Sequence, residues 1–284
     1  MNGMMLREET KNLARKNGVE LRKEKDQSHL VDESVLKRII DYAGIDADER
    51  ILEIGAGLGN LTKYLLDTEA SIFAVEKDER LVEVLRERFG GSELEIIQGD
   101  ALETDLPDFD KVVANLPYSI SSPISFHLAK RKFDLGVLMY QKEFAERMMA
   151  KPGSSEYSRL SVNLSLHYDV ELLEEVSPDK FFPQPEVSSS IVRVTSSDPS
   201  YEISSRDIFH KVVTGVFQHR RKKLRNGLYN SFVKIFQDLD FSDKEKRNFI
   251  DDNIPEEIQG KRPGKVTPEQ FAKLANNFAE NKKI

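Results

Sequence analysis

The stretch Arg50-Ile51-Leu52-Glu53-Ile54-Gly55-Ala56-Gly57-Leu58-Gly59 decides the fold class of this 284-residue chain. Arg50–Ile54 predicts a short buried strand, and Leu61–Leu66 predicts a helix directly after the glycines. Glycine at a strand-to-helix turn lets a ligand approach the backbone, and the amide groups at the start of the helix favour polar or anionic ligands. We therefore expect a ligand site where this strand ends.

Short apolar runs alternate with helical patterns on both sides of this turn. Further strands are predicted at Ser71–Glu76, Leu94–Gly99, Lys111–Asn115 and Leu135–Tyr140, with helices at 33–43, 79–89, 125–130 and 142–150. Such alternation is typical of a parallel sheet buried on both faces. Val170–Val176 and Ser190–Thr195 have little helix between them, which predicts an antiparallel edge pair. The expected fold class is α/β, a Rossmann-like domain with a mostly parallel seven-stranded sheet.

The pattern changes after Ser196–Ser200, a stretch typical of a linker. Only helices are predicted beyond it, at 206–217, 228–237, 243–251 and 268–276. The helically spaced stripe of apolar residues is expected in the core of these helices: Phe209, Val212, Val213, Val216 and Phe217. We predict two domains, residues 1–198, which begin with an arm at 1–32, and a small all-helical domain at 199–284.

Acidic residues stand at three consecutive strand ends. Glu53 precedes Gly55 by two residues, Glu76 ends the second predicted strand, and Asp100 follows the third. A carboxylate at the first position suits an α-amino group, one at the second can accept both hydroxyls of a ribose, and one at the third can accept from an adenine amino group. This set fits S-adenosyl-L-methionine better than NAD, because Asn60 breaks the dinucleotide fingerprint G-x-G-x-x-G. The plainer alternative is that strand–glycine–helix turns occur in many α/β proteins.

The fourth of these strands ends in Asn115-Leu116-Pro117-Tyr118. The amide oxygen of Asn115 and the backbone carbonyl of Leu116 can accept the N–H bonds of a base amino group, which orients its nitrogen toward a methyl donor and stabilises developing positive charge. Tyr118 offers a flat face for an unstacked base. No general base is required, since the proton can leave after transfer. An ordinary strand-end turn is the alternative, and the position after the glycine turn favours the functional interpretation.

Charge divides the chain into two parts of opposite sign. The whole chain has a net charge of −7, which by itself argues against a nucleic-acid partner. Residues 199–284, however, hold 17 basic against 12 acidic side chains. Five of these cations form one run: Arg220, Arg221, Lys222, Lys223 and Arg225. Phosphate contacts from such a run would give sequence-independent RNA affinity, and a solvated helix face is the alternative.

Composition excludes several classes of protein. No apolar run approaches 18 residues and the first residues lack an apolar segment, so neither a membrane span nor a secretory signal is expected. Cysteine is absent and the five histidines are scattered, so no metal is expected. The absence of cysteine fits a reducing cytoplasm.

Over most of its length the chain resembles the KsgA family of small-subunit ribosomal RNA adenine dimethyltransferases. The resemblance is carried, in order, by residues 26–32 (DQSHLVD), the E-x-G-x-G-x-G turn, Asn115–Tyr118, 141–147 (QKEFAER), 151–153 (KPG), 157–162 (YSRLSV), 181–189 (FFPQPEVSS) and the basic run. It implies a donor site made of Gln27, Ser28, Leu30, Glu53, Gly55, Gly57, Gly59, Glu76, Asp100, Ala101 and Asn115. It also implies that Tyr118 and Phe181 hold the target adenine between them.

His29 departs from the family pattern. The family usually has Gln-His-Phe-Leu or Gln-Asn-Phe-Leu where this chain has Gln27-Ser28-His29-Leu30. His29 either stacks in place of the phenylalanine, with less apolar area buried, or is a solvated loop residue.

The resemblance implies methyl transfer from S-adenosyl-L-methionine to N6 of adenine, repeated to give dimethyladenine. The expected target is two adjacent adenosines near the 3′ end of small-subunit ribosomal RNA, within a pre-ribosomal particle, and the enzyme is expected to be a cytoplasmic monomer. A methyltransferase of large-subunit ribosomal RNA is an alternative that residues 151–162 and 181–189 disfavour. A non-catalytic RNA-binding assembly factor is another, against which the intact Asn115 and Tyr118 argue. An NAD dehydrogenase is more remote.

Overall fold

The computed structural model describes residues 2–21 and 28–281, which fall into two compact units. Unit 1 comprises Met1–Ala145 and Asp169–Ser196, and unit 2 comprises Glu146–Tyr168 and Ser197–Ile284. One change of unit therefore lies two residues from the predicted boundary at 198. Glu146–Tyr168, which the sequence places in the first domain, belongs with the helices of unit 2.

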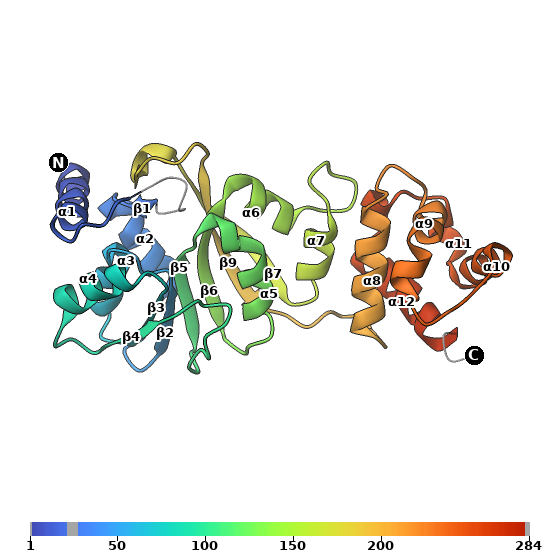
Figure 1. Ribbon diagram of the computed structural model, residues 1–284, viewed down its shortest axis with the longest axis horizontal. Helices are drawn as coiled ribbons and strands as arrows, with labels where there is room; N and C mark the ends of the chain where they lie inside the picture. Colours follow the sequence, from blue (N-terminus) through green and yellow to red (C-terminus); the bar gives the residue numbers. More distant parts are fainter. Residues whose placement is uncertain (1, 22–27, 282–284) are drawn as a thin grey trace. The chain divides into compact units, whose positions relative to one another are not determined.

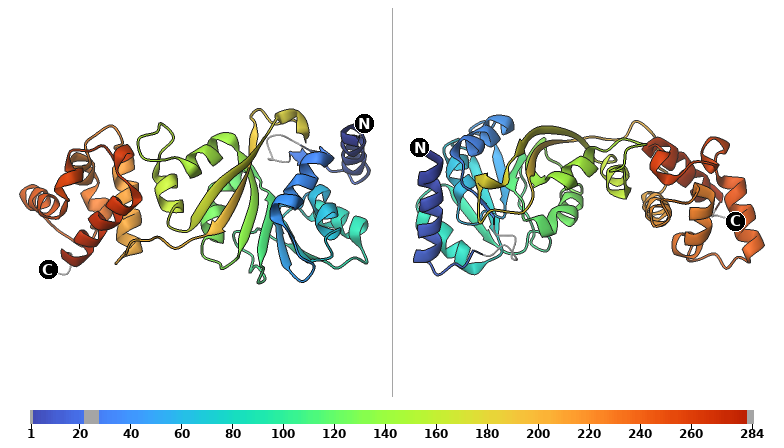
Figure 2. Two further views of the ribbon diagram at one scale, coloured as in Figure 1. Left: turned by 180° about the vertical axis from the view of Figure 1, so that it is seen from behind. Right: turned by 90° about the horizontal axis from the view of Figure 1, so that it is seen from above.

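Unit 1 is built on one seven-stranded sheet with the strand order β4-β3-β2-β5-β6-β9-β7 (Figure 1). Its strands are β2 (Arg50–Ile54), β3 (Ser71–Glu76), β4 (Leu94–Gln98), β5 (Lys111–Asn115), β6 (Leu135–Gln141), β7 (Tyr168–Val176) and β9 (Ser189–Ser196). The first five strands pair in parallel, and β9 pairs antiparallel with β6. The predicted mostly parallel sheet of seven strands is confirmed. Seen from behind and from above, its strands form one twisted layer (Figure 2).

The buried strands explain why the sequence predicted them well. In β2, every residue after Arg50 is buried, and β6 is buried from Gly136 to Tyr140. A strand covered on both faces needs a continuous apolar run, and such a run is visible without knowledge of the tertiary structure.

Helices and a small second sheet complete unit 1. The helices are α1 (Asn2–Lys16), α2 (Glu33–Ala43), α3 (Asn60–Leu66), α4 (Glu79–Phe89) and α5 (Ser121–Leu128), and α6 (Lys142–Met149) continues into unit 2. Asp32 and Asp78 cap α2 and α4 by accepting hydrogen bonds from the first backbone N–H groups. Strand β1 (His29–Leu30) pairs antiparallel with β8 (Phe181–Phe182), which ties the segment before α2 to a distant part of the chain.

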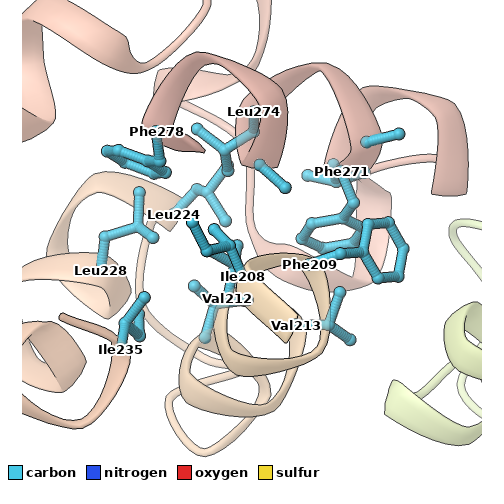
Figure 3. Close-up of a cluster of buried hydrophobic side chains, with 14 of the residues drawn as sticks. Ile208, Phe209, Val212, Val213, Leu224, Leu228, Ile235, Phe271, Leu274 and Phe278 are labelled. Atoms are coloured by element: carbon cyan, nitrogen blue, oxygen red, sulfur yellow. The ribbon is translucent and has the colours of Figure 1, made fainter. Parts of the chain in front are cut away.

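Unit 2 is helical, as predicted. Its helices are α7 (Arg159–Leu164), α8 (Arg206–Phe217), α9 (Leu224–Ile235), α10 (Asp243–Asn253), α11 (Glu256–Gln259) and α12 (Pro268–Asn281). Figure 3 shows Phe209, Val212 and Val213 of α8 packed with side chains of α9 and α12, so the predicted core stripe is confirmed. Among the described residues, no helix combines the length and apolar character needed to cross a lipid bilayer.

Candidate active site

A cavity of about 520 Å³ lies at the carboxyl ends of β2, β3 and β5. Strand order reverses between β2 and β5, and open α/β sheets bind ligands at such a switch point. Nine residues predicted from the sequence line the cavity: Ser28, Gly55, Gly57, Glu76, Asp100, Ala101, Asn115, Leu116 and Tyr118. The volume is in the range of small-molecule sites.

Two glycines bring the backbone of the turn to the wall of this cavity. Gly55 and Gly57 have φ angles of 73° and 60°, in the left-handed region that favours glycine. A Cβ on Gly57 would lie 2.6 Å from Cε1 of His29, and one on Gly55 would lie 3.1 Å from Cδ of Pro117. A side chain at Gly57 would therefore collide with His29, which lines the same cavity.

Glu76 fixes the turn to the end of β3. Its Oε2 accepts from the backbone N–H of Gly57 at 2.9 Å, and its Oε1 accepts from that of Asp78 at 2.9 Å. Burial raises the pKa of Glu76, and these hydrogen bonds oppose the rise. The backbone N–H of Lys77 also helps to oppose the rise, and a carboxylate with three such donors still has acceptor capacity for a ligand hydroxyl.

Asp100 lies on the cavity wall beyond β4. Its Oδ2 accepts from Nζ of Lys77 at 2.7 Å and its Oδ1 from the backbone N–H of Leu102 at 2.9 Å. The hydrogen bond from Lys77 is the main reason that the pKa of Asp100 is lowered. The carboxylate is thus kept ionised as an acceptor, while the exposed Lys77 adds little to stability.

The position of Asn115 determines which way its amide faces. Its Nδ2 donates to the carbonyl oxygen of Ser28 at 3.2 Å. A carbonyl can only accept, so the NH2 group must face Ser28, and Oδ1 is left to accept from another donor. The hydroxyl of Tyr118 lies 2.7 Å from Oγ of Ser189, a contact that holds the half-buried ring beside the cavity.

Three residues of the expected donor site lie away from the cavity. Glu53 is buried, accepts a hydrogen bond from Thr62 at 2.6 Å, and has a pKa that burial raises to about 8. Leu30 packs in the hydrophobic cluster of unit 1. A Cβ on Gly59 would meet Phe89 of α4, so this glycine allows helix packing. Gln27, also expected in the donor site, lies outside the described residues.

Phe181 does not face the cavity. Its ring is completely buried in the hydrophobic cluster that contains Leu30 and Leu36, and Phe181 pairs with Leu30 across the β1–β8 ladder. The expected sandwich of an adenine between Tyr118 and Phe181 is therefore not preformed. The physical reason is the apolar surroundings of β8, which keep this ring in the core.

His29 is not a solvated loop residue. It is 9% exposed, lines the cavity beside Gly57, and its Nε2 has no hydrogen-bond partner among the described residues. Burial lowers the pKa of His29 to about 4, so the ring is neutral at physiological pH. No local signal in the sequence indicates this position of His29, because His29 pairs with Phe182 of β8, which lies far along the chain.

The five cations of the basic run in unit 2 differ in whether they have partners within the protein. Arg220 donates from Nη2 to the backbone oxygen of Ser155 at 2.8 Å, and Arg225 forms a bidentate pair with Asp251 of α10. Arg221, Lys222 and Lys223 are exposed and have no carboxylate partner in the part of the chain that the structure describes. These three are therefore the members of the run that remain available to an anion.

Sequence reasoning missed two charged residues of the cavity. Lys77 and Asp78 line it directly after β3. Asp78 could have been found from its position as an acidic cap before the amphipathic pattern of α4. Over residues 2–21 and 28–281, no group of three or more His, Cys, Asp or Glu is arranged to hold a metal ion.

A family model described as ribosomal RNA adenine dimethylase matches residues 18–258. The chain belongs to this family. It is 45% identical over 252 residues to a probable ribosomal RNA small subunit methyltransferase A of Methanococcoides burtonii, covering 88% of this chain and 91% of that one. It is 40% identical to the protein of the same description from Methanothermobacter thermautotrophicus, covering 96% of both chains.

Two solved structures have folds similar to that of this chain. A dimethyladenosine transferase from Plasmodium falciparum is 32% identical with a TM-score of 0.74, and the match covers 89% of this chain and 98% of that one. The 23S rRNA methyltransferase ErmE is 25% identical with a TM-score of 0.62, covering 88% of this chain and 99% of that one. The Rossmann-like methyltransferase fold predicted from the sequence is confirmed.

Proposed function

We propose that this protein transfers two methyl groups from S-adenosyl-L-methionine to N6 of each of two adjacent adenosines near the 3′ end of small-subunit ribosomal RNA. The observation that carries the proposal is the amide of Asn115, which Ser28 orients so that Oδ1 remains an acceptor at the cavity. The choice of the small subunit is supported by relatives of that description at 40% and 45% identity over nearly their whole length.

The cavity fits the methyl donor in both size and polarity. Glu76 can accept from a ribose hydroxyl, the ionised Asp100 can accept from an amino group, and Gly55 and Gly57 bring the backbone of the turn to the cavity wall. S-adenosyl-L-methionine, when bound, supplies a methyl group activated by its sulfonium. Glu53 would act through the turn and not by contact, because it is buried behind it.

Residues at the end of β5 and directly after it orient the acceptor nitrogen. Oδ1 of Asn115 and the carbonyl oxygen of Leu116 accept the two N–H bonds of an adenine amino group, so that its lone pair faces the methyl donor. The same two oxygens stabilise positive charge on the nitrogen during transfer. Tyr118 supports the base through its ring face, and the proton leaves to solvent afterwards.

The test is incubation of unmethylated small and large ribosomal subunits with methyl-labelled donor, followed by mass spectrometry of the RNA. We expect two adjacent dimethyladenosines in small-subunit RNA alone. Label confined to large-subunit RNA would establish the alternative that the likeness to ErmE favours. RNA binding without label in either subunit would identify a non-catalytic assembly factor.

The same proposal includes a pre-ribosomal particle as substrate, a cytoplasmic site of action and a monomeric state. Sedimentation of the purified protein tests the monomeric state.

A further inference from the structure

A second cavity lies within unit 2, against one face of α9. Its volume is about 320 Å³, and its polar lining comes from the turn before α9, from α9 and from α10: Lys222, Arg225, Asn226, Tyr229, Asn230 and Arg247. Positions 225, 226, 229 and 230 recur at helical spacing, so they share one side of α9, and Lys222 lies in the turn before this helix. The buried Ile250 of α10 also lines the cavity.

The cations of this cavity differ in what compensates them. Nη2 of Arg225 lies 2.6 Å from Oδ2 of Asp251, and Nε of Arg225 bonds the other oxygen, so this pair joins α9 to α10 and neutralises its own charge. Lys222 forms no ion pair among the residues that the structure describes, and Arg247 lies near enough to Asp251 to help lower the pKa of that carboxyl. Three cations therefore share one carboxylate, and an excess of positive charge borders one small cavity.

Arg247 is held in a defined position. Its guanidinium lies 4.8 Å from the centroid of the Tyr229 ring, a cation–π contact that limits its motion. A guanidinium binds phosphate oxygens in a bidentate manner, and one that is already positioned loses less entropy on binding. No local pattern pointed to this residue, because it lies more than twenty positions beyond the basic run.

The remaining polar groups of the cavity can form hydrogen bonds with the edge of a nucleotide base. Asn226 and Asn230 are exposed, stand one helical turn apart, and each offers an amide donor and an amide acceptor. Proteins read RNA sequence largely on unpaired bases, whose hydrogen-bonding edges are accessible. Phosphate-binding cations and carboxamides thus meet in a space that has room for one nucleotide and not for a helix.

We propose that this cavity binds a single unpaired nucleotide of the substrate RNA. Its phosphate lies between Lys222 and Arg247, and its base edge contacts Asn226 and Asn230. The inference rests on the proposed function only in that the ligand is RNA. It places a second, structure-selective contact in unit 2, beside the sequence-independent contacts of Arg221 and Lys223.

The experiment measures binding of the full chain, without methyl donor, to a labelled single-stranded RNA and to a hairpin of the same base composition. Arg247→Ala is expected to weaken single-strand binding roughly 10-fold and to reduce the salt slope by about 0.7, the value for one phosphate on a single strand. Arg247→Lys should retain the slope and lose part of the affinity, because it keeps the charge but not the bidentate geometry. Lys244→Ala is the matched control, an exposed cation of the same helix outside the cavity.

The double variant Asn226→Ala/Asn230→Ala separates base reading from charge. It should weaken single-strand binding several-fold, leave the salt slope unchanged and leave hairpin binding unaffected, whereas Asn248→Ala should change none of these. The proposal is overturned if Arg247→Ala equals Lys244→Ala, or if the asparagine variant affects both RNAs alike. It is also overturned if free adenosine monophosphate displaces the RNA at concentrations near the RNA Kd, since the cavity would then hold a free nucleotide.

Thermal unfolding of each variant establishes that it folds. If Arg247→Ala is unstable, the RNA affinity and salt slope of Arg247→Lys test the role of Arg247 instead. All of these measurements are independent of methylation. A wild-type protein that binds RNA in this way but forms no dimethyladenosine would contradict the proposed function alone.

Discussion

Glu76 holds the turn through Gly57, and we propose that it also binds the ribose of the methyl donor. We expect Glu76→Ala to weaken binding of S-adenosyl-L-methionine by about 10- to 150-fold, corresponding to ~1.5–3 kcal/mol for hydrogen bonds to a charged group. The rate at saturating donor should change less. Calorimetry of donor binding provides the measurement, and Glu79→Ala, an exposed acid of α4, provides the control. Unchanged donor affinity in Glu76→Ala would refute the ribose assignment.

Asn115 and Tyr118 should affect the two methyl transfers differently. An unmodified amino group has two N–H donors, and after the first transfer only one remains, so the intermediate depends more on stacking. Asn115→Ala is expected to slow the first transfer by ~10²–10³, the scale for one oriented polar group at a centre of developing charge. Tyr118→Ala should let monomethyladenine accumulate, which a mass-spectrometric time course measures. Equal product ratios in wild type and Tyr118→Ala would mean that stacking does not support the second step.

Glu53 makes stability depend on pH. Its pKa rises from 4.5 when exposed to about 8 in the folded protein, so the folded state holds a proton that the unfolded state has released. The contribution to the free energy of unfolding is therefore full below about pH 4.5 and is lost as pH rises toward about 8. Glu53→Gln retains the acceptor for Thr62 and does not titrate.

We expect Glu53→Gln to match wild type at about pH 5 and to be the more stable protein at about pH 9. Urea unfolding at both pH values measures this difference. Glu79→Gln, at an exposed position, should show no such pH-dependent gain. An equal difference at both pH values would place the effect in packing.

At the scale of elements, the β2–α3 turn and β1 constrain each other. Gly57→Ala places a Cβ 2.6 Å from the His29 ring in a backbone conformation with φ of 60°. Gly44→Ala is a matched control, since Gly44 ends α2 with φ of 53° and no atom within 4 Å of its Cβ position. We expect Gly44→Ala to cost ~1–2 kcal/mol of unfolding free energy from conformation alone, and Gly57→Ala to cost more.

Adding His29→Ala tests the origin of that excess. The double variant Gly57→Ala/His29→Ala removes the collision and keeps the strained φ angle, so its coupling energy should be favourable in a double-mutant cycle of chemical unfolding. Additive effects would show that the ring of His29 does not restrict this turn.

The elements also show where sequence reasoning reaches its limit. Glu76, Asp100 and Asn115 line one cavity because they stand at the ends of parallel strands, which meet at the same edge of the sheet. Their proximity could be predicted from the apolar runs of the strands alone. The inward position of Phe181 did not follow, since it depends on pairing with β1. Helices α7 and α11 were not predicted because six and four residues are too few for a clear period.

At the scale of the whole molecule, the opposite charges of the two parts predict a salt response confined to RNA binding. The triple variant Arg221→Ala/Lys222→Ala/Lys223→Ala should weaken RNA binding and lower the salt slope by about 2, while donor affinity stays unchanged. Arg220 is excluded because it is bonded to the backbone of Ser155. Filter binding from low to moderate salt measures the slope. The control neutralises three exposed cations of unit 1, Lys37, Lys63 and Arg86. An unchanged salt slope in the triple variant would mean that the basic run is a solvated surface that does not contact RNA.

The pairing of β1 with β8 has a consequence for synthesis of the chain. His29 stands opposite Phe182, about 150 residues later, and this ladder supports the ring that closes the cavity over Gly57. A nascent chain that has emerged only as far as β6 has every parallel strand of the sheet but lacks the partner for β1. The wall of the cavity that His29 forms is therefore completed only when β8 has emerged, late in the synthesis of unit 1.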